Sequence, residues 1–423
     1  MSGLEQTIPD GYQLTEVGVI PDDWKCINFG ELGDVVRGGS PRPAGDPKYF
    51  NGKYIPWLTV ASLTNIKSSE QVVTSTKAML TQLGSLQSRI LESGTLIISN
   101  SGATLGVAKI LGLKCCANDG VAALINKKKG DASFLVHYLN TQTKRLHDEV
   151  ATGNGQPNLN TDLIKLIPIP FPSEEEQTAI ANALSNVDAL LSELEKLIAK
   201  KQAIKTATMQ QLLTGKTRLP QFATDTNGDK QGQVKGTKPS ELGEIPEDWK
   251  VVEFGSLANS VGSGKTSTKE KGEFPLFGST GQIGTCLNDD YVGDALLVAR
   301  VGANAGTLNF VSGRYGVSDN TIIISIKKGV EIAFYKYLLI RKNLNSLVFG
   351  SGQPLITGSQ LKALKVVYPT PKEQTAIATI LSDMDEEIQA LQQRLSKTRQ
   401  IKQGMMQELL TGKTRLIQGE AHD

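Results

Sequence analysis

A 47-residue stretch, SEEEQTAIANALSNVDALLSELEKLIAKKQAIKTATMQQLLTGKTRL (173–219), returns as TPKEQTAIATILSDMDEEIQALQQRLSKTRQIKQGMMQELLTGKTRL (370–416). The two copies share 23 identical positions without a gap. In each copy, apolar residues alternate in steps of four and three, the spacing of a coiled-coil seam. The seam residues are Ile180, Leu184, Val187, Leu191, Leu194 and Ile198 in the first copy, and Ile377, Leu381, Met384, Ile388, Leu391 and Leu395 in the second. We predict two long helices that bury this seam against each other.

The spacing continues less strictly to the end of each copy, through Ile204 and Leu212 and through Ile401, Met405 and Leu409. At the other end, Ser173 and Thr370 each precede acidic residues, a pattern typical of a helix start. We therefore predict that these two residues cap the helices.

Both copies end in Gly-Lys-Thr, which resembles the end of a phosphate-binding loop. Such a loop needs a leading glycine separated by four residues from the Gly-Lys pair, and it opens a helix. Gln210 and Gln407 occupy the leading positions here, and the triplets follow a helical pattern. A third triplet, within residues 262–267, has Asn259 at that position. We predict instead that Gly215 and Gly412 end the helices in the left-handed conformation.

The segments before the helices also form a repeat. GVIPDDWKCINFGEL (18–32) matches GEIPEDWKVVEFGSL (243–257), and Gly-Gln-Pro triplets occur at 155–157 and 352–354. Gly102–Gly106 weakly matches Gly302–Gly306. Short β-branched runs predict strands, and two segments have helical spacing. The predicted strands are 95–100, 122–126, 295–302 and 320–328, and the predicted helices are 132–141 and 333–344.

The fold class that we predict is α+β, with two mixed, strand-rich globular domains, two long helices and a pseudo-two-fold internal repeat. The polar stretch rich in Gly and Thr that follows the first helix predicts a linker. The predicted limits are 1–172 for the first domain, 173–219 for the first helix, 220–242 for the linker, 243–369 for the second domain, 370–416 for the second helix and 417–423 for the tail.

The composition of the chain excludes several kinds of functional site. Lysines and arginines total 45 against 43 acids, so an anionic partner must be met by a local basic surface. The four cysteines form no C-x-x-C, the three histidines form no metal motif, and no apolar run approaches a membrane span. We expect no catalytic residues, no metal and no cofactor in this chain, and a cytoplasmic location.

The doubled motifs resemble the DNA specificity subunit of type I restriction–modification enzymes. The motifs that support the resemblance are the I-P-x-D-W openings at residues 20–24 and 245–249, the G-Q-P triplets, EQTAIA at 176–181 and 373–378, and the paired LLTGKTRL ends. The resemblance implies two target-recognition domains separated by two helical regions that pair antiparallel. It also implies double-stranded DNA and two modification (methyltransferase) subunits as partners, which restriction subunits can join. S-adenosylmethionine would then be bound by the methyltransferase, and ATP and Mg by the restriction partner.

Within that resemblance, the two domains differ where the helices agree, which predicts an asymmetric, bipartite DNA site whose gap the helices set. Polar and basic loop residues are the candidates for DNA contact. They are Arg37, Ser40, Arg42, Lys48, Tyr49, Thr59 and Ser62 in the first domain, and Ser279, Thr280, Gln282, Arg300, Asn304 and Asn320 in the second. A wider set of cations comprises Lys53, Lys67, Arg89, Lys109, Lys265, Lys269, Lys271, Arg314 and Arg341. For Trp24 and Trp249 we predict packing rather than base stacking.

Two alternatives remain open at this level. A coiled-coil adaptor that clamps proteins without touching DNA would show the same helices. An ATPase would use the Gly-Lys-Thr triplets, although the missing leading glycines argue against it. Salt-dependent DNA binding separates the first alternative from the DNA-reading hypothesis.

Overall fold

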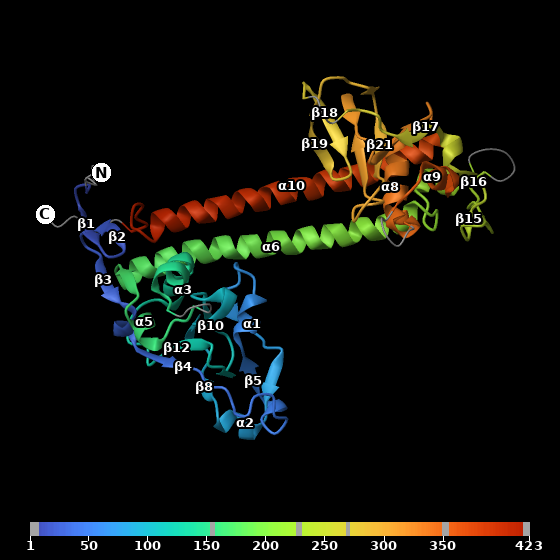
Figure 1. The fold of residues 1–423 in the computed structure, drawn as a ribbon. Helices are drawn as coiled ribbons and strands as arrows, with labels where there is room; N and C mark the ends of the chain where they lie inside the picture. The colour runs from blue at the N-terminus through green and yellow to red at the C-terminus, as the bar shows by residue number, and fades with distance from the viewer. Residues whose placement is uncertain (1–7, 153–156, 226–230, 268–270, 349–354, 418–423) are drawn as a thin grey trace. The chain divides into compact units, whose positions relative to one another are not determined.

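The computed structural model describes residues 8–152, 157–225, 231–267, 271–348 and 355–417. The Gly-Gln-Pro triplets lie wholly or largely outside these ranges. The chain forms two compact units, each containing one globular head (Figure 1). Unit 1 comprises residues 1–196 and 393–423, and unit 2 comprises residues 197–392. Unit 1 is therefore assembled from two segments that lie far apart in the sequence, whereas unit 2 is one continuous segment.

Two long helices, α6 (Glu174–Leu212) and α10 (Pro371–Leu409), contribute to both units. The first half of α6 and the last half of α10 belong to unit 1. The last half of α6 and the first half of α10 belong to unit 2. Within unit 1, Lys402 of α10 pairs with Asp188 of α6 at 2.6 Å. Within unit 2, Lys205 of α6 pairs with Asp385 of α10. These pairs confirm that the helices run antiparallel.

The predicted seam is buried. Ile180, Leu184, Ile377 and Leu381 are at most 1% exposed, and Leu191, Leu194, Ile198 and Ile388 at most 8%. Val187, Met384, Leu391 and Leu395 are half-buried.

The predicted continuation of the seam is wrong at two positions, because Ile204 is 40% exposed and Ile401 is 49% exposed. Both residues fall out of phase with the alternating steps of four and three. The in-phase positions include Lys205 and Lys402, whose ammonium groups reach the acids of the opposite helix. Leu212 and Leu409 are in phase and are buried.

The head of unit 1 contains two main sheets. One has the strand order β4-β12-β9-β10-β6, and the other has the order β7-β5-β11-β8. Strands β5 and β11 pair in parallel, and Ala117 lies opposite Leu58. The strands are β1 (Tyr12–Thr15), β2 (Gly18–Pro21), β3 (Lys25–Asn28), β4 (Asp34–Arg37), β5 (Phe50–Leu58), β6 (Val72–Val73), β7 (Ala78–Leu80), β8 (Arg89–Leu91), β9 (Leu96–Ser99), β10 (Ala108–Leu111), β11 (Cys115–Ala117), β12 (Val121–Ile125) and β13 (Pro168–Phe171). The helices are α1 (Val60–Thr64), α2 (Gln82–Leu86), α3 (Ala132–Thr141), α4 (Thr143–Arg145) and α5 (Thr161–Lys165).

The head of unit 2 has the corresponding sheets, with orders β17-β24-β21-β22 and β19-β18-β23-β20. Strands β18 and β23 pair in parallel, and Val317 lies opposite Phe277. The strands are β14 (Thr237–Lys238), β15 (Ile245–Pro246), β16 (Lys250–Glu253), β17 (Ala258–Ser263), β18 (Phe274–Gly278), β19 (Gly281–Cys286), β20 (Tyr291–Val292), β21 (Ala295–Ala299), β22 (Leu308–Val311), β23 (Arg314–Val317), β24 (Thr321–Ile326) and β25 (Lys365–Tyr368). The helices are α7 (Pro220–Ala223), α8 (Ile332–Lys342) and α9 (Gly358–Ala363).

These elements confirm the strand and helix predictions made from the short apolar runs, which become β9, β12, β21, β24, α3 and α8. The stretch predicted as a linker contains α7 and β14, and β14 pairs with β15. The limits of the two domains stay predictions.

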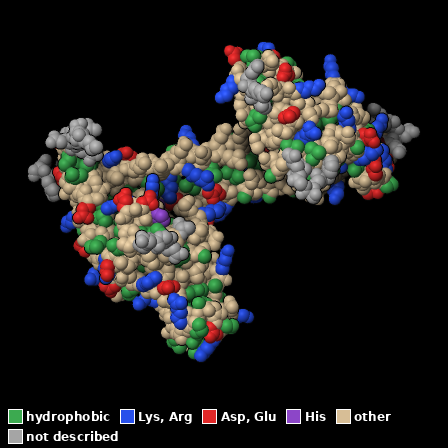
Figure 2. Space-filling model, viewed as in Figure 1, with side chains coloured by type: hydrophobic (Ala, Val, Ile, Leu, Met, Phe, Trp, Pro, Cys, Tyr) green, Lys and Arg blue, Asp and Glu red, His purple; other side chains and the backbone are tan. Residues whose placement is uncertain are grey.

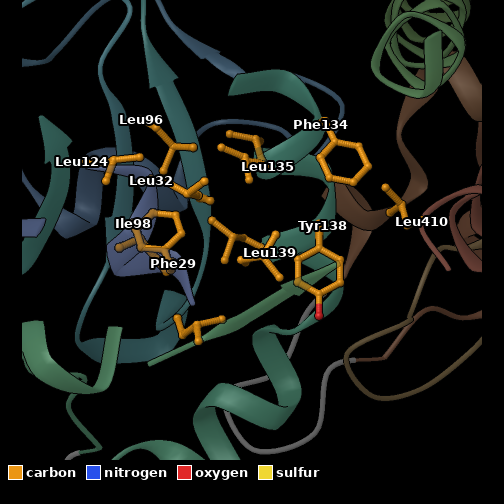
Figure 3. Close-up of a cluster of buried hydrophobic side chains, with 14 of the residues drawn as sticks. Phe29, Leu32, Leu96, Ile98, Leu124, Phe134, Leu135, Tyr138, Leu139 and Leu410 are labelled. Atoms are coloured by element: carbon orange, nitrogen blue, oxygen red, sulfur yellow. The ribbon is translucent and has the colours of Figure 1, made fainter. Parts of the chain in front are cut away.

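The core of each head closes on the two long helices. In unit 1, Phe29, Leu32, Phe134 and Leu135 cluster with Ile98 at the centre of the head (Figure 3). Ile180 and Leu184 of α6 belong to the same cluster, as do Leu409 and Leu410 at the end of α10. In unit 2, the corresponding cluster contains Phe254, Leu257, Phe334 and Tyr335 with Ile377 and Leu381 of α10, and Met209, Leu212 and Leu213 at the end of α6.

A partly buried ion cluster, here called the Trp-Glu-Arg clasp, joins the start of one long helix to the end of the other. In unit 1, the Trp24 indole N–H donates to Glu176 at 3.0 Å. The Arg415 guanidinium donates to the same carboxylate at 2.6 Å and also pairs with Asp23 at 2.8 Å. The hydrogen bonds to Glu176 and Asp23 raise the pKa of Arg415 above its usual value.

Unit 2 repeats the clasp residue for residue. Trp249 donates to Glu373 at 2.9 Å, and Arg218 pairs with Glu373 at 2.6 Å and with Asp248 at 2.9 Å. Trp24 and Trp249 are at most 1% exposed, which confirms the packing role predicted for them.

The residue after each clasp glutamate ties the helix to its head. Gln177 donates to the Pro172 carbonyl at 2.9 Å and accepts from the Asp131 N–H at 2.8 Å. Gln374 repeats both bonds with Pro369 and Glu331. The EQ pair of the repeated motif thus fixes each helix start, together with the predicted caps, because Ser173 and Thr370 accept from the third helical N–H groups.

Each long helix ends at a left-handed glycine, as predicted. Gly215 has φ +71° and Gly412 has φ +69°. The Gly215 N–H reaches the Leu212 carbonyl at 3.2 Å, and Thr217 N–H reaches Gln211 at 3.3 Å, which closes the last turn. A β-carbon at Gly215 would lie 2.4 Å from the Pro246 ring. The Gly-Lys-Thr triplets at 215–217 and 412–414 are therefore helix ends that pack on the opening motifs.

We expect Gly215→Ala and Gly412→Ala each to lower the free energy of unfolding by roughly 1 kcal/mol or more, because positive φ is strained for alanine and its methyl group meets a proline ring. Gly404→Ala is the matched control, because Gly404 lies inside α10 and a β-carbon added there would meet no neighbouring atom within 4 Å. That control should stabilise the protein by up to about 1 kcal/mol. Chemical denaturation measures all three, and equal effects at the three sites would contradict the helix-end assignment.

We expect Glu373→Gln to destabilise unit 2 by about 3 kcal/mol, because it leaves the largely buried Arg218 without its closest carboxylate. Glu193→Gln is the control, since Glu193 forms an ion pair with Lys196 in which both side chains are at least 67% exposed. That control should change stability by at most about 0.5 kcal/mol. Thermal unfolding compares the two variants, and a similar small effect for both would show that the clasp does not hold the unit together.

Candidate nucleic-acid interface

In unit 1, several strands end or begin at one edge of the head. Strands β4, β5 and β9 end there, and β12 begins there. The Gly38 N–H donates to Val121 at 2.8 Å, Asn118 N–H to Leu58 at 2.9 Å, and Asn100 N–H to Gly120 at 3.0 Å. These main-chain bonds bring together a set of loop residues that we call the strand-end rim of unit 1. It comprises Arg37–Arg42, Thr59, Asn100 and Asn118–Gly120.

Asp119 organises the polar side chains of this rim. Ser40 donates to its carboxylate at 2.5 Å, and the Arg37 Nε donates to its carbonyl at 2.5 Å. Arg42 lies 3.9 Å from the carboxylate and is 75% exposed. The hydrogen bond from Ser40, aided by the charges of Arg37 and Arg42, lowers the pKa of Asp119. Asp119 therefore stays ionised and holds the two guanidiniums at the surface.

Of the remaining candidates, Lys48 and Tyr49 precede the start of β5, whereas Thr59 and Ser62 follow its end at the rim. The Lys48 ammonium is 5.6 Å from the centre of the Tyr49 ring, and Lys48 is exposed. Thr59 and Ser62 cap α1 together, and the Ser62 N–H donates to Thr59 at 3.3 Å. The Arg89 Nε donates to the Arg37 carbonyl at 2.8 Å, which adds another cation to the rim.

Unit 2 builds a strand-end rim on the corresponding main-chain bonds. The Gly264 N–H donates to Thr321 at 2.8 Å, Ser318 N–H to Phe277 at 2.9 Å, and Arg300 N–H to Asn320 at 2.9 Å. The rim comprises Ser263–Thr266, Ser279, Arg300 and Ser318–Asn320. Its scaffold is thus the same as in unit 1.

The side chains on the second rim differ from those on the first. The Arg300 guanidinium donates to Ser263 at 3.3 Å, and the Ser279 hydroxyl donates to the Asn320 carbonyl at 3.1 Å. The position of Arg300 in this rim corresponds to that of Asn100 in unit 1. Exposed side chains continue outward from the rim at Thr280, Gln282 and Asn304.

The structure therefore gathers most of the predicted residues at two equivalent edges, and it corrects one member of the wider set. Lys109 is 2% exposed, and its ammonium donates to the carbonyls of Lys67 and Glu70, so it holds a loop and does not face solvent. Burial lowers the pKa of Lys109. Arg341 lies at the end of α8, where it lines a groove with Met209 and Leu213.

The remaining members of the wider set divide by their surroundings. Lys67 pairs with Glu195 at 2.6 Å, and Arg314 pairs with Asp289 at 2.5 Å. Lys53, Lys265 and Lys271 are exposed. Lys269 lies outside the described residues.

Sequence reasoning missed Asp119, Asn100 and Gln87, whose carbonyl oxygen accepts from the Arg42 N–H at 3.2 Å. A signal for one of them was present, because Asp119 and Asp319 align in the register that pairs Gly102 with Gly302, and each lies just before a strand. No comparable signal marked Gln87, which reaches the rim only through folding.

The rim residues are donors and acceptors that match base edges and phosphates. Figure 2 shows Lys and Arg side chains mixed with Asp and Glu on the end of unit 1 that carries α2, β5 and β8. Among the described residues, no group of three or more His, Cys, Asp or Glu could hold a metal ion. Likewise, none of the helices in the described ranges is long and apolar enough to cross a membrane.

Comparison with known proteins identifies a family whose model matches most of this chain. The model of the type I restriction modification DNA specificity domain matches residues 21–206 and 246–399. The type I restriction enzyme MjaVIII specificity subunit of Methanocaldococcus jannaschii is 26% identical over 431 residues, which cover 94% of each chain. The type I restriction enzyme EcoprrI specificity subunit of Escherichia coli is 24% identical over 363 residues, covering 83% of this chain and 85% of the relative.

Two solved structures share the fold. The S subunit of a type I restriction–modification system from M. genitalium superposes with a TM-score of 0.62 and 17% identity, covering 94% of this chain and 97% of that chain. A chain from work on complex assembly and conformational transition of the type I R-M system superposes with a TM-score of 0.53 and 16% identity. It covers 93% of this chain and 99% of that chain.

We expect Arg42→Gln to weaken binding of DNA and to reduce the slope of log affinity against log salt by about 1, if the guanidinium contacts a phosphate. If Arg42 contacts a base instead, about 1–3 kcal/mol should be lost on one sequence only. Lys114→Gln is the control, because it removes the same charge at the opposite end of β11. Fluorescence anisotropy at several salt concentrations measures both, and identical binding by the two variants would remove Arg42 from the interface.

Proposed function

Because the chain belongs to the family of the type I restriction modification DNA specificity domain, we propose that it is the sequence-recognition subunit of a type I restriction–modification complex. Each head would read one half of an asymmetric, bipartite DNA site. The recognition domains would be residues 1–172 and 243–369, with the helical regions 173–219 and 370–416, a linker at 220–242 and a tail at 417–423. The coiled-coil adaptor gains no support, since the family match covers the heads as well as the helices.

The observation that carries this proposal is the doubled strand-end rim. The two rims use equivalent main-chain hydrogen bonds, yet the side chains that reach the surface differ, with Arg37 and Arg42 in one rim and Ser279 and Arg300 in the other. A main-chain scaffold that holds its shape while the side chains change suits two readers of different base sequences. The side chains that would contact DNA are the rim candidates named above.

The proposal extends to the rest of the complex. Two modification subunits would dock on surfaces that the internal repeat makes equivalent, and restriction subunits can join them. The methyltransferase would bind S-adenosylmethionine, and ATP and Mg would be used by the restriction partner. This chain would supply the sequence specificity, and the long helices would set the gap between the half-sites.

Two changes to the chain test which part reads the bases and which part sets the gap between the half-sites. We expect one added heptad in each helix, after Lys200 and after Ala390, to keep the seam in register while lengthening each helix by about 10 Å. The unread gap should then grow by up to about three base pairs, at about 3.4 Å per pair, while the bases read stay the same. Replacing residues 25–152 with another head of the family should do the reverse and change one half-site but keep the gap.

Methylome sequencing of hosts that carry each variant with the partner subunits reports half-sites and gap in one measurement. A heptad insertion that altered the bases read, or a head exchange that altered only the gap, would contradict the division of roles. A host whose methylation pattern is the same with and without the unmodified chain would contradict the proposed function itself.

A further inference from the structure

A groove of 970 Å³ lies in unit 2 at the end of α6. The last turns of α6, the segment that leads into β15, and the end of α8 form its walls. Apolar side chains supply much of the lining, among them Met209, Leu213, Ile245, Leu338 and Val367. Ile340 borders the same groove and is 45% exposed. We call this the end groove of unit 2.

Unit 1 carries a smaller end groove, of 350 Å³, at the equivalent place. In the register of the helical repeat, Met406 and Leu410 correspond to Met209 and Leu213, and both line the groove. The opening motif again contributes an isoleucine, Ile20, where unit 2 has Ile245. Repetition of one lining in both halves of a chain provides equivalent surfaces for two copies of one partner.

One wall differs between the two end grooves. The register that pairs Gly102 with Gly302 places Thr141 and Gln142 opposite Arg341 and Lys342. Thr141 and Gln142 line the groove of unit 1, and Arg341 and Lys342 line that of unit 2. Lys216 and Glu244 also line the groove of unit 2, whereas none of the described residues that line the groove of unit 1 is charged.

The two cations of this wall are uncompensated. Within the described ranges, no hydrogen bond or ion pair joins the side chain of Arg341 or Lys342 to another residue. Burial lowers the pKa of each, and the neighbouring charge of Arg341 adds to the effect at Lys342. Glu244 offsets only part of the positive charge that these two residues and Lys216 bring, so the groove favours an anionic occupant.

We propose that the two end grooves dock the same segment of two copies of the modification subunit, an amphipathic segment with apolar side chains toward the groove and acidic side chains at its edge. The inference rests on the proposed function, because that function supplies two copies of one partner. The repeated apolar lining accounts for the two sites. The cations of unit 2 make its groove the tighter of the two, so the first copy loads there.

The difference in charge between the two grooves should make their affinities for the modification subunit depend differently on salt. At low ionic strength we expect the groove of unit 2 to bind the modification subunit about tenfold more tightly than that of unit 1. Salt screens the attraction of partly exposed cations, so the two affinities should converge near roughly 0.5 M salt. The affinity of the groove in unit 1 should depend little on salt.

The test uses the full-length chain and the purified modification subunit, with native mass spectrometry to count bound copies and calorimetry to measure affinities. Arg341→Thr with Lys342→Gln gives unit 2 the wall of unit 1, and Thr141→Arg with Gln142→Lys does the opposite. The first double variant should lose the tenfold difference, and the second should tighten the weaker site. These four positions lie at helix ends on the surface, so folding should be unaffected.

Met209→Glu and Met406→Glu test the lining, and each should reduce the bound copies from two to one. Retention of two copies by both variants would overturn the docking sites, and unchanged affinities in both wall variants would overturn the loading order. Neither result touches the proposed function, which fails only if the unmodified chain directs no sequence-specific methylation by the same modification subunit. Methylome sequencing in parallel keeps the two outcomes apart.

Discussion

One carboxylate in the first turn of each long helix determines how the chain closes on itself. Glu176 and Glu373 are at most 2% exposed, and a buried charge persists only with partners. The opening motif supplies the tryptophan N–H, and the end of the opposite helix supplies the arginine. Each head is thereby bound to the start of one helix and the end of the other. An antiparallel pair of helices satisfies both carboxylates with the same set of residues.

The polar pairs along the helices reinforce this orientation. Lys402 and Lys205 occupy in-phase positions where leucine would pack more tightly, and they pair with Asp188 and Asp385 of the opposite helix. A polar group within a seam costs stability but selects one register, because any shift leaves the charge without its partner. In unit 1 the neighbouring His137 is buried, which lowers its pKa to about 3. His137 therefore stays neutral beside Lys402 and adds no repulsion at neutral pH.

Much of this architecture could be predicted from the sequence, because it depends on local periodicity and on repetition. The seam, the caps at Ser173 and Thr370, and the left-handed Gly215 and Gly412 all follow from spacing within one or two turns. The error at Ile204 and Ile401 arose because an apolar residue was accepted one position out of phase. Phase, rather than apolarity, decides which side of a helix faces its partner.

The rims were harder to predict, because their hydrogen bonds join residues that are distant in the sequence. The Asn118 N–H donates to the Leu58 carbonyl, and the Arg42 N–H to the Gln87 side chain, in a head where β5 and β11 pair in parallel. Residue type and loop position could nominate Arg37, Ser40 and Arg42, but not Asp119, which gathers them. Lys109 illustrates the converse, since nothing local distinguished a buried lysine that binds carbonyls from an exposed one.

The separation of main-chain scaffold from side-chain surface has a consequence for how such a chain can change. The rims rest on carbonyl and N–H groups, which every residue except proline supplies in full. Side chains such as Arg42 or Arg300 can therefore be replaced without loss of the main-chain bonds that shape the rim. The clasp allows no such freedom, because Glu176, Trp24 and Arg415 interact through their side chains. A new half-site thus requires changes only where the fold depends least on residue identity, and the two long helices can keep their contacts throughout.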